Sequence, residues 1–143
     1  MILVYVAGRY TATDRAGVER NIRAAEDVGI ELARAGFMPV IPHSNTARPE
    51  FEDAQGYAFW IRGTMLLMER CDALVTVPDW EASSGARGEV ARMLELKRPV
   101  AHSVAELVAE LARLAAAPKC RRCGRPQAEC DAEKNAPDVE LFP

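Results

Sequence analysis

The sequence of 143 residues has few aromatic residues, few histidines and little net charge. Aromatic side chains make up 6% of the chain, and only two histidines occur. The 18 lysines and arginines nearly balance the 21 aspartates and glutamates, so the formal net charge is −3. A weakly acidic chain lacks the positive field that attracts nucleic acid or an anionic membrane. We therefore expect neither a nucleic-acid polymer nor a membrane as a partner.

Long apolar runs and export signals are also missing. Apolar runs such as residues 2–7 are far shorter than the roughly 20 residues that a membrane-spanning helix needs. Met1 leads directly into an apolar segment with no basic region before it, so the sequence indicates no signal peptide. We expect a cytoplasmic protein, and in that compartment a disulfide framework is uncommon.

The hydrophobic residues that are present, 49% of the chain, alternate between short β-type runs and helical periodicity. Strands are predicted at residues 2–6, 37–41, 73–77 and 99–101, and helices at residues 18–34, 59–70, 85–96 and 103–116. Strands that alternate with helices favour a parallel sheet with right-handed crossovers. We predict an α/β fold, a Rossmann-like or flavodoxin-like three-layer sandwich with a parallel sheet of four to five strands.

Local signals mark the helix ends and the end of the domain. Asp14 is a candidate N-cap for the first helix, and Gly36 a candidate stop. Ser103 and Glu106 have the spacing of a capping box before the last helix. Beyond Pro118 helical periodicity fades and prolines are scattered. We predict an α/β domain over residues 1–117 and a cysteine-containing tail over residues 118–143.

Ligands of open parallel sheets bind beyond the carboxyl ends of the strands. Here that rule selects residues 7–10, 42–45, 78–89 and 102–103. The third segment ends in small residues that open a helix, and backbone N–H groups at a helix start favour an anion. Glu89 lies close to that start, where the helix dipole would keep its carboxylate ionised. Such a carboxylate can act as a nucleophile, although it can equally serve only to compensate the dipole.

Several common cofactor motifs are absent. No G-x-G-x-x-G follows the first strand, and no G-x-x-x-x-G-K-[ST] occurs, which argues against a dehydrogenase and a P-loop enzyme. His43 and His102 are far apart in the sequence and no H-E-x-x-H pattern exists, so a catalytic zinc is not indicated. We therefore expect no cofactor for the reaction.

Three segments resemble the nucleoside 2-deoxyribosyltransferases and the related deoxynucleoside 5′-monophosphate N-glycosidases. Residues 5–8 (YVAG) resemble the Y-x-x-G of their first strand, and residues 71–75 (CDALV) their third strand. Residues 84–89 (SGARGE) resemble the helix start that carries their glutamate. The spacing of Pro78, Trp80, Ser83 or Ser84, Gly85, Ala86 and Glu89 is most similar to the DUF4406 branch. The resemblance covers residues 2–101.

The resemblance implies a mechanism. Glu89 matches the glutamate that attacks the anomeric carbon and expels the nucleobase, and Tyr5 the tyrosine that orients it. Water then completes a hydrolysis, or a second base completes a transfer. Gly8 and Arg9 match a loop that contacts sugar and phosphate. Ser83 or Ser84 matches the serine that touches a 5′-phosphate, and relatives usually form dimers or larger oligomers.

The sequence departs from the resemblance at the acid that protonates the leaving base. Active relatives carry an aspartate near the start of the helix before the third strand, where residues 60–65 (WIRGTM) contain none. Asp79, Glu81 or Asp53 could replace it, and Asp79 is the preferred candidate. Since a general acid contributes about 10²–10⁴-fold, its loss would leave a slow enzyme or a non-catalytic nucleotide-binding module.

Further side chains are candidates for ligand contacts. His43 could line the site or be a solvated loop histidine, and Trp80, Gly85 and Arg87 belong to the polar segment that precedes and opens the glutamate helix. Trp60 could stack on a base or pack in the core. The apolar residues 59–68 are the candidate interface of a homodimer or higher homo-oligomer.

The cysteines of the tail remain open to three interpretations. Cys120, Cys123 and Cys130 provide a C-x₂-C pair with a third thiol, which is half of a zinc-ribbon pattern. A structural zinc, free thiols and a disulfide are all compatible with this spacing. The tail is too short to form a redox domain of its own.

Overall fold

A computed structural model of the chain describes residues 1–48, 54–118 and 120. By compactness the chain divides into two units, Met1–Glu110 and Leu111–Pro143. This boundary falls inside the last helix, whereas the composition changes only after residue 117. The sheet and the helices that flank it belong to the first unit.

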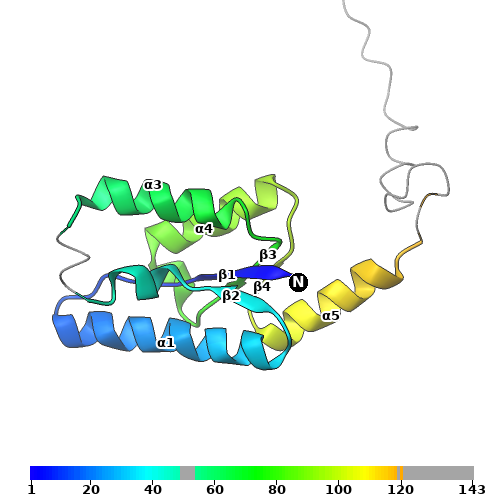
Figure 1. Ribbon diagram of the computed structural model, residues 1–143, viewed down its shortest axis with the longest axis horizontal. Coiled ribbons are helices and arrows are strands. Elements are labelled where there is room, and N and C mark those ends of the chain that lie inside the picture. The colour runs from blue at the N-terminus through cyan, green and yellow to red at the C-terminus, as the bar shows by residue number, and fades with distance from the viewer. Residues whose placement is uncertain (49–53, 119, 121–143) are drawn as a thin grey trace, which may run out of the picture. The chain divides into compact units, whose positions relative to one another are not determined.

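The sheet contains four parallel strands in the order β2-β1-β3-β4 (Figure 1). They are β1 (Leu3–Ala7), β2 (Met38–Val40), β3 (Ala73–Thr76) and β4 (Val100–Ala101). Tyr5 of β1 lies in register with Val40 on one side and with Leu74 on the other. The two central strands are buried along almost their whole length, as continuous apolar runs predict for parallel strands covered on both faces. The predicted α/β class and parallel sheet are confirmed.

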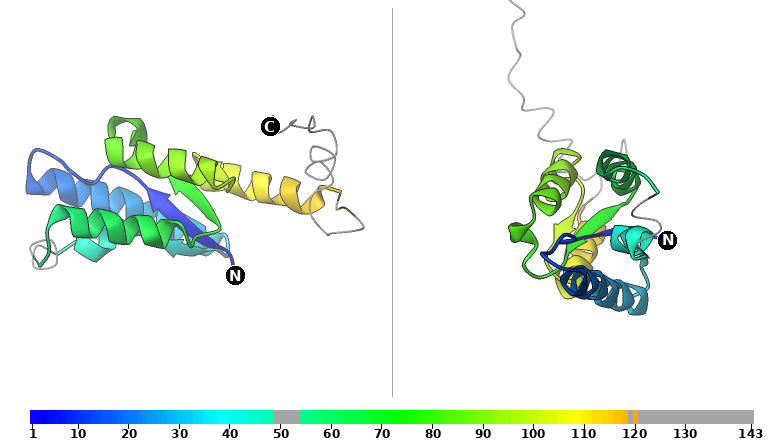
Figure 2. Two further views of the ribbon diagram at one scale, coloured as in Figure 1. Left: turned by 90° about the horizontal axis from the view of Figure 1, so that it is seen from above. Right: turned by 90° about the vertical axis from the view of Figure 1, so that its left-hand side faces the viewer.

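Helices cover both faces of this sheet. Helix α1 (Arg15–Arg34) packs on one face, and α3 (Tyr57–Met68) and α4 (Ser84–Glu95) lie on the other (Figures 1 and 2). Two short 3₁₀ turns follow strands: η1 (Pro42–Thr46) comes after β2, and η2 (Trp80–Ala82) after β3. The last helix is α5 (Val104–Ala116). The result is the three-layer arrangement that the sequence predicts.

Helix α1 ends at the predicted residue 34 and begins directly after the candidate N-cap Asp14, three residues before the predicted residue 18. The Asp14 side chain accepts a hydrogen bond from the Gly17 N–H at 2.6 Å, which makes Asp14 the N-cap. Gly36 adopts a left-handed conformation with φ of 87°, which glycine tolerates best. The buried face includes Gly29, where an added Cβ would lie 2.3 Å from Ile41 Cδ1. The absent side chain therefore allows α1 to approach the chain that follows β2.

Helix α4 carries the central carboxylate of the site described below. Ser83 is its N-cap, because the Ser83 Oγ accepts a hydrogen bond from the Ala86 N–H at 3.2 Å. Ala86, Val90 and Met93 form its buried face. Leu94 lies one position beyond this stripe and is 58% exposed. Burial of this stripe fixes the rotation of the helix.

The start of α5 forms only part of the predicted capping box. Ser103 Oγ accepts from the Glu106 N–H at 3.1 Å, as expected. The Glu106 carboxylate accepts from the N–H of His102, at 2.6 Å, rather than from that of Ser103. Val104 and Leu107, in the first turn of α5, are buried. Among the described helices, none is both long enough and apolar enough to cross a lipid bilayer.

Candidate active site

A cavity of about 340 Å³ lies beyond the carboxyl end of β1. Its lining comes from the loop after β1 (residues 8–11), η1 (Pro42, His43 and Thr46), α3 (Tyr57, Trp60, Ile61 and Thr64) and the start of α4 (residues 82–86 and Glu89). Three of the four predicted segments therefore meet at one cavity. The fourth, residues 102–103, contributes nothing to the described lining.

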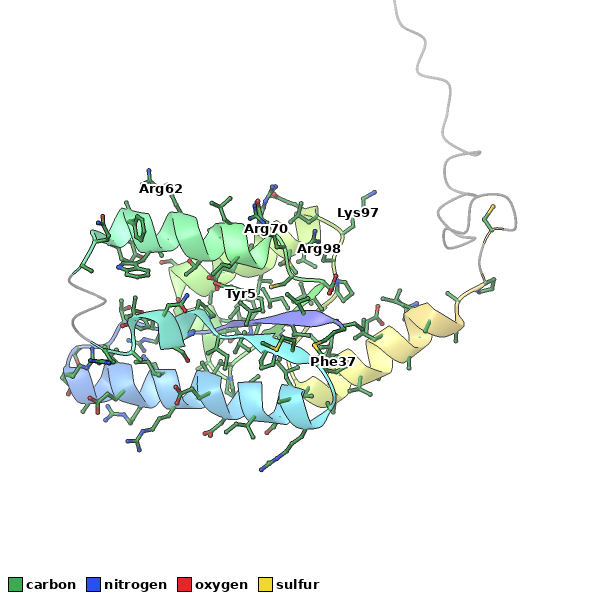
Figure 3. The ribbon with its side chains drawn as sticks, in the orientation of Figure 1. Tyr5, Phe37, Arg62, Arg70, Lys97 and Arg98 are labelled. Atoms are coloured by element: carbon green, nitrogen blue, oxygen red, sulfur yellow. The ribbon has the colours of Figure 1, made fainter. Side chains whose placement is uncertain are left out.

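A tyrosine and a glutamate from distant parts of the chain meet beside this cavity. The Tyr5 hydroxyl donates a hydrogen bond to Glu89 Oε1 at 2.6 Å. Tyr5 comes from the central strand and is fully buried between the sheet and the layer of α3 and α4 (Figure 3). Glu89 comes from α4 and lines the cavity. Because the phenol occupies Oε1, the second carboxylate oxygen remains available to a ligand.

Burial determines the ionisation of this pair. It raises the pKa of Glu89 to about 7, although the hydrogen bond from Tyr5 acts in the opposite direction. Burial, and then the charge of Glu89, also raise the pKa of Tyr5 well above its ordinary value. A pKa of about 7 departs from the expectation that the helix dipole keeps Glu89 ionised, because burial disfavours the charged form. A carboxylate with a pKa near 7 suits both nucleophilic attack and proton transfer at neutral pH.

The predicted anion-binding residues lie together in the lining. Gly8, Arg9, Ser83, Ser84 and Gly85 all contribute to it. At Gly8 an added Cβ would stand 2.8 Å from Val77 Cγ2, so the tight packing excludes a side chain there. The Arg9 Nε donates to the Thr11 carbonyl at 2.9 Å, which holds the guanidinium near the loop. Since Ser83 caps α4, Ser84 is the better placed of the two serines for a ligand contact.

His43 lies inside the site and is only 5% exposed. Its Nε2 is 3.2 Å from the carbonyl oxygen of Arg9, and its ring is 5.9 Å from that of Tyr10, centroid to centroid. Burial lowers the pKa of His43, and the backbone carbonyls of Arg9 and Gly8 partly oppose this effect. Of the two alternatives for this histidine, the structure supports the site-lining one.

Three predicted site residues do not line the cavity. Asp79 adopts a left-handed conformation with φ of 61° and starts the turn η2. Trp80 stacks on His102, with the ring centroids 5.5 Å apart and the planes 9° apart, and packs against the core. The Arg87 guanidinium donates to the Glu81 carbonyl. The loop after β3 thus turns toward the residues that follow β4, which carries Asp79 and Trp80 away from the cavity, while Arg87 on α4 reaches back to that loop.

No predicted candidate for the general acid is found in the described lining of the cavity. Glu89 is the only carboxylate in the described lining of the cavity. Neither Asp79 nor Glu81 contributes to it, and Asp53 lies outside the described residues. Asp72, which matches the third-strand motif, accepts a hydrogen bond from the Leu3 N–H at 2.8 Å. That bond joins the strands β1 and β3 at their starts, which is a structural role.

Sequence patterns did not identify the wall that α3 contributes. Tyr57, Trp60 and Thr64 are spaced one helical turn apart, so they lie on one face, and all three line the cavity. This helix is apolar on nearly all sides, and its own pattern therefore gives no sign of which face meets a ligand. Trp60, a candidate for base stacking or for core packing, belongs to this wall.

Two of the three cysteines of the predicted zinc site lie outside the described residues. In residues 1–48, 54–118 and 120, no group of three or more histidine, cysteine or acidic side chains is arranged to hold a metal ion. Cys71 is a buried free thiol, and Cys120 is a free thiol of intermediate exposure. Cys123 and Cys130 lie outside the described residues.

Fold and site together define a parallel α/β protein with a buried tyrosine–glutamate pair beside a cavity at the carboxyl edge of the sheet. Residues 2–105 match the family described as "Domain of unknown function (DUF1937)". The match spans most of the chain, and the protein belongs to that family. No curated protein matches the chain significantly. Because the family description assigns no activity, the likeness to nucleoside deoxyribosyltransferases remains a prediction.

Proposed function

We propose that this protein cleaves the N-glycosidic bond of a nucleoside, a deoxynucleoside or its 5′-monophosphate, with Glu89 as the nucleophile. The observation that supports this most directly is the 2.6 Å hydrogen bond between the Tyr5 hydroxyl and Glu89 Oε1 at the cavity. A phenol fixed on one carboxylate oxygen orients the other oxygen toward the cavity. Tyr5 is therefore a positioning residue in this proposal, and Glu89 the catalytic residue.

The reaction follows the scheme of retaining glycosidases. The free oxygen of Glu89 attacks the anomeric carbon, and the C–N bond breaks with its electron pair going to the base. The base takes up a proton and leaves, while the sugar remains as an ester of Glu89. Water, or the nitrogen of a second base, then attacks the same carbon and releases the carboxylate. No cofactor is needed for these steps.

A phosphate on the substrate would bind at the start of α4. The backbone N–H groups of the first turn attract an anion, and Ser84, Gly85 and Arg9 lie in the same lining. The net charge of −3 does not oppose this, because local donors rather than the overall field would hold the phosphate. A nucleotide substrate is consistent with our expectation of a cytoplasmic protein.

A second candidate function is that of a nucleotide-binding module without turnover. One observation favours it: the described lining contains no carboxylate besides Glu89. Without a group to protonate the leaving base, expulsion of that base would be slow. Nucleotide affinity without base release would identify such a module.

The test is base release, followed by liquid chromatography, from the common nucleosides, deoxynucleosides and their 5′-monophosphates. We expect release by the unmodified protein and its loss in Glu89→Ala and Glu89→Gln. Glu95→Gln is the matched control, because Glu95 lies on the same helix and outside the cavity, in an exposed ion pair with Arg92. Full activity of Glu89→Ala would overturn the mechanism. Binding of a nucleotide without any base release would support the binding module instead.

We further propose that the protein assembles as a homodimer or a higher homo-oligomer through α3. This helix leaves several large apolar side chains exposed, including Phe59 at 47% and Leu66 at 54%, which lie seven residues apart and so on one face. Contiguous exposed apolar surface of this kind is typical of an interaction site. Arg62 on the same helix points away from the sheet (Figure 3). Since α3 also lines the cavity, a second copy bound there would lie next to the site.

A further proposal concerns the tail, where Cys120, Cys123 and Cys130 would bind a structural zinc. The C-x₂-C spacing supports it, because two thiolates so spaced can share a tetrahedral ion. Three cysteines leave one position for a further ligand, which Asp131, His102, Cys71 or a residue of another subunit could supply. The ion would not take part in the reaction at Glu89.

A further inference from the structure

The loop that follows β1 is held by side chains that bind its backbone carbonyl oxygens. His43 Nε2 lies 3.2 Å from the Arg9 carbonyl oxygen. Asn21 Nδ2 donates to the Tyr10 carbonyl oxygen at 2.9 Å. The Thr11 carbonyl oxygen accepts from Arg9 Nε at 2.9 Å and lies 3.4 Å from the same Asn21 nitrogen. Because a surface loop could bind water at these oxygens instead, the side chains restrain the loop to one conformation.

Asn21 joins this loop to helix α1. Both of its partners are carbonyl oxygens, which only accept, so the amide presents its NH₂ group to them. Gly17 lies one helical turn earlier, and a Cβ added there would stand 2.5 Å from the Cβ of Ala12. The absent side chain of Gly17 therefore allows the chain that follows the loop to lie directly on α1, beside Asn21.

The hydrogen bond to Thr11 determines which part of the Arg9 guanidinium can meet a ligand. Arg9 is exposed and lines the cavity, so a ligand has access to it. The bond to Thr11 uses Nε. Within the part of the chain that the structure describes, the two terminal nitrogens of Arg9 have no partner, and they can bind the oxygens of a phosphate. The position of the Thr11 carbonyl thus influences where the charge of Arg9 lies.

We propose that Asn21 is a positioning residue for the phosphate of the substrate: it holds the carbonyls of Tyr10 and Thr11, and through Thr11 it places the guanidinium of Arg9 at the cavity. This proposal rests on the proposed function, in which Arg9 is one of the donors to the phosphate. Asn21 is absent from the described lining of the cavity, so it acts through the loop and not by touching the substrate. Its removal should weaken phosphate binding and leave the rest of the substrate unaffected.

Two substitutions of Asn21 remove the donor without weakening the helix. Asn21→Leu keeps the size of the side chain and Asn21→Ala truncates it, and both residues have a higher helix propensity than asparagine. Arg23→Ala is the matched control, because Arg23 is an exposed residue of the same helix. Arg9→Met removes the charge and keeps a long side chain.

The measurement is the dissociation constant by calorimetry, in a Glu89→Gln background that prevents turnover. The probes are the four common deoxynucleoside 5′-monophosphates and the corresponding deoxynucleosides. Each Asn21 substitution is measured alone and combined with Arg9→Met, which completes a double-mutant cycle. Urea unfolding of each variant confirms that it is folded.

We expect Asn21→Leu and Asn21→Ala to weaken the tightest-binding monophosphate about fivefold and its nucleoside hardly at all, since one hydrogen bond contributes about that factor. Arg23→Ala should bind both as the unsubstituted protein does. In the Arg9→Met background the Asn21 substitutions should have little further effect, because no guanidinium remains to be positioned.

Three results would overturn the role of Asn21. The first is equal weakening of nucleotide and nucleoside, which would indicate a general disturbance of the site. The second is an undiminished effect of Asn21→Leu in the Arg9→Met background, because Asn21 would then act independently of Arg9. The third is unchanged affinity in both Asn21 variants, or no binding of any probe.

Failure of this proposal can be separated from failure of the proposed function. Base release by the unmodified protein, with nucleosides bound as tightly as their monophosphates, would overturn the role of Asn21 and leave the function standing. The expected coupling between Asn21 and Arg9, without base release, would support the role of Asn21 and identify a binding module.

Discussion

Replacing Glu89 with glutamine should stabilise the protein at alkaline pH. Glutamine keeps an oxygen that can accept the hydrogen bond from the Tyr5 hydroxyl, and it carries no charge. Glu89, in contrast, must be ionised above its pKa in a place where burial disfavours the charge. The native protein therefore holds a carboxylate that costs stability above its pKa.

The size of the effect follows from the pKa of Glu89. Burial raises it from the ordinary 4.5 to about 7. At about 1.4 kcal/mol per pKa unit, the folded state disfavours the ionised form by about 3 kcal/mol relative to the unfolded chain. Between pH 4.5 and 7 the folded state binds the proton more tightly, so the free energy of unfolding falls as the pH rises through this range. Below pH 4.5 the carboxyl is neutral in both states, and this penalty disappears.

The assay is urea unfolding of the unmodified protein and Glu89→Gln at about pH 8 and at about pH 4. The stability gain of Glu89→Gln should be larger at the higher pH by about 3 kcal/mol. Glu95→Gln is the control, because Glu95 is an exposed surface residue and should show no comparable change with pH. An equal effect of Glu89→Gln at both pH values would refute the argument that Glu89 is ionised against a burial penalty.

Three further predictions concern Tyr5, α3 and the tail. Tyr5→Phe removes the hydrogen bond that lowers the pKa of Glu89, so an NMR titration of the Glu89 carboxyl should give a midpoint above about 7; an unchanged midpoint would show that the bond does not stabilise the carboxylate. Leu66→Asp should convert an oligomer into monomers in sedimentation analysis, whereas Leu94→Asp, which replaces an equally exposed leucine of α4, should not; identical behaviour of the two would exclude an α3 interface. Cys120→Ser should lower the zinc content of purified protein, and zinc-free unmodified protein would contradict the proposed tail site.

Much of the fold follows from local sequence signals. The apolar runs around Tyr5 and Leu74 predict buried parallel strands. Asp14 marks the start of α1 because its side chain caps the helix, and Gly36 marks the end because glycine tolerates the left-handed backbone there. The right-handed crossover rule explains why α1 and α3 cover opposite faces once β2 and β3 lie on opposite sides of β1, but local signals do not determine that strand order. What local signals do not provide is the boundary between compact units, which falls within the continuous helix α5.

The site was predictable where it depends on strand ends and unpredictable where it depends on packing. The meeting of the loop after β1, η1 and the start of α4 follows from the topology. The pKa of Glu89 does not, because burial depends on the helices α3 and α4 packing together. The sequence also predicted Asp79 and Trp80 in the site, where the structure does not place them. The left-handed backbone of Asp79 and the stacking of Trp80 on His102 turn the loop after β3 away from the cavity. Neither feature has a recognisable pattern in the sequence.

The most direct test of the central claim is detection of the covalent intermediate on Glu89. The protein would be mixed with the nucleotide that it cleaves fastest, quenched in acid within one turnover, digested and analysed by mass spectrometry. The account predicts a sugar or sugar-phosphate adduct on the peptide that contains Glu89, and its absence in Glu89→Gln. Base release without an adduct, at a rate that Glu89→Gln retains, would contradict the assignment of Glu89 as the nucleophile.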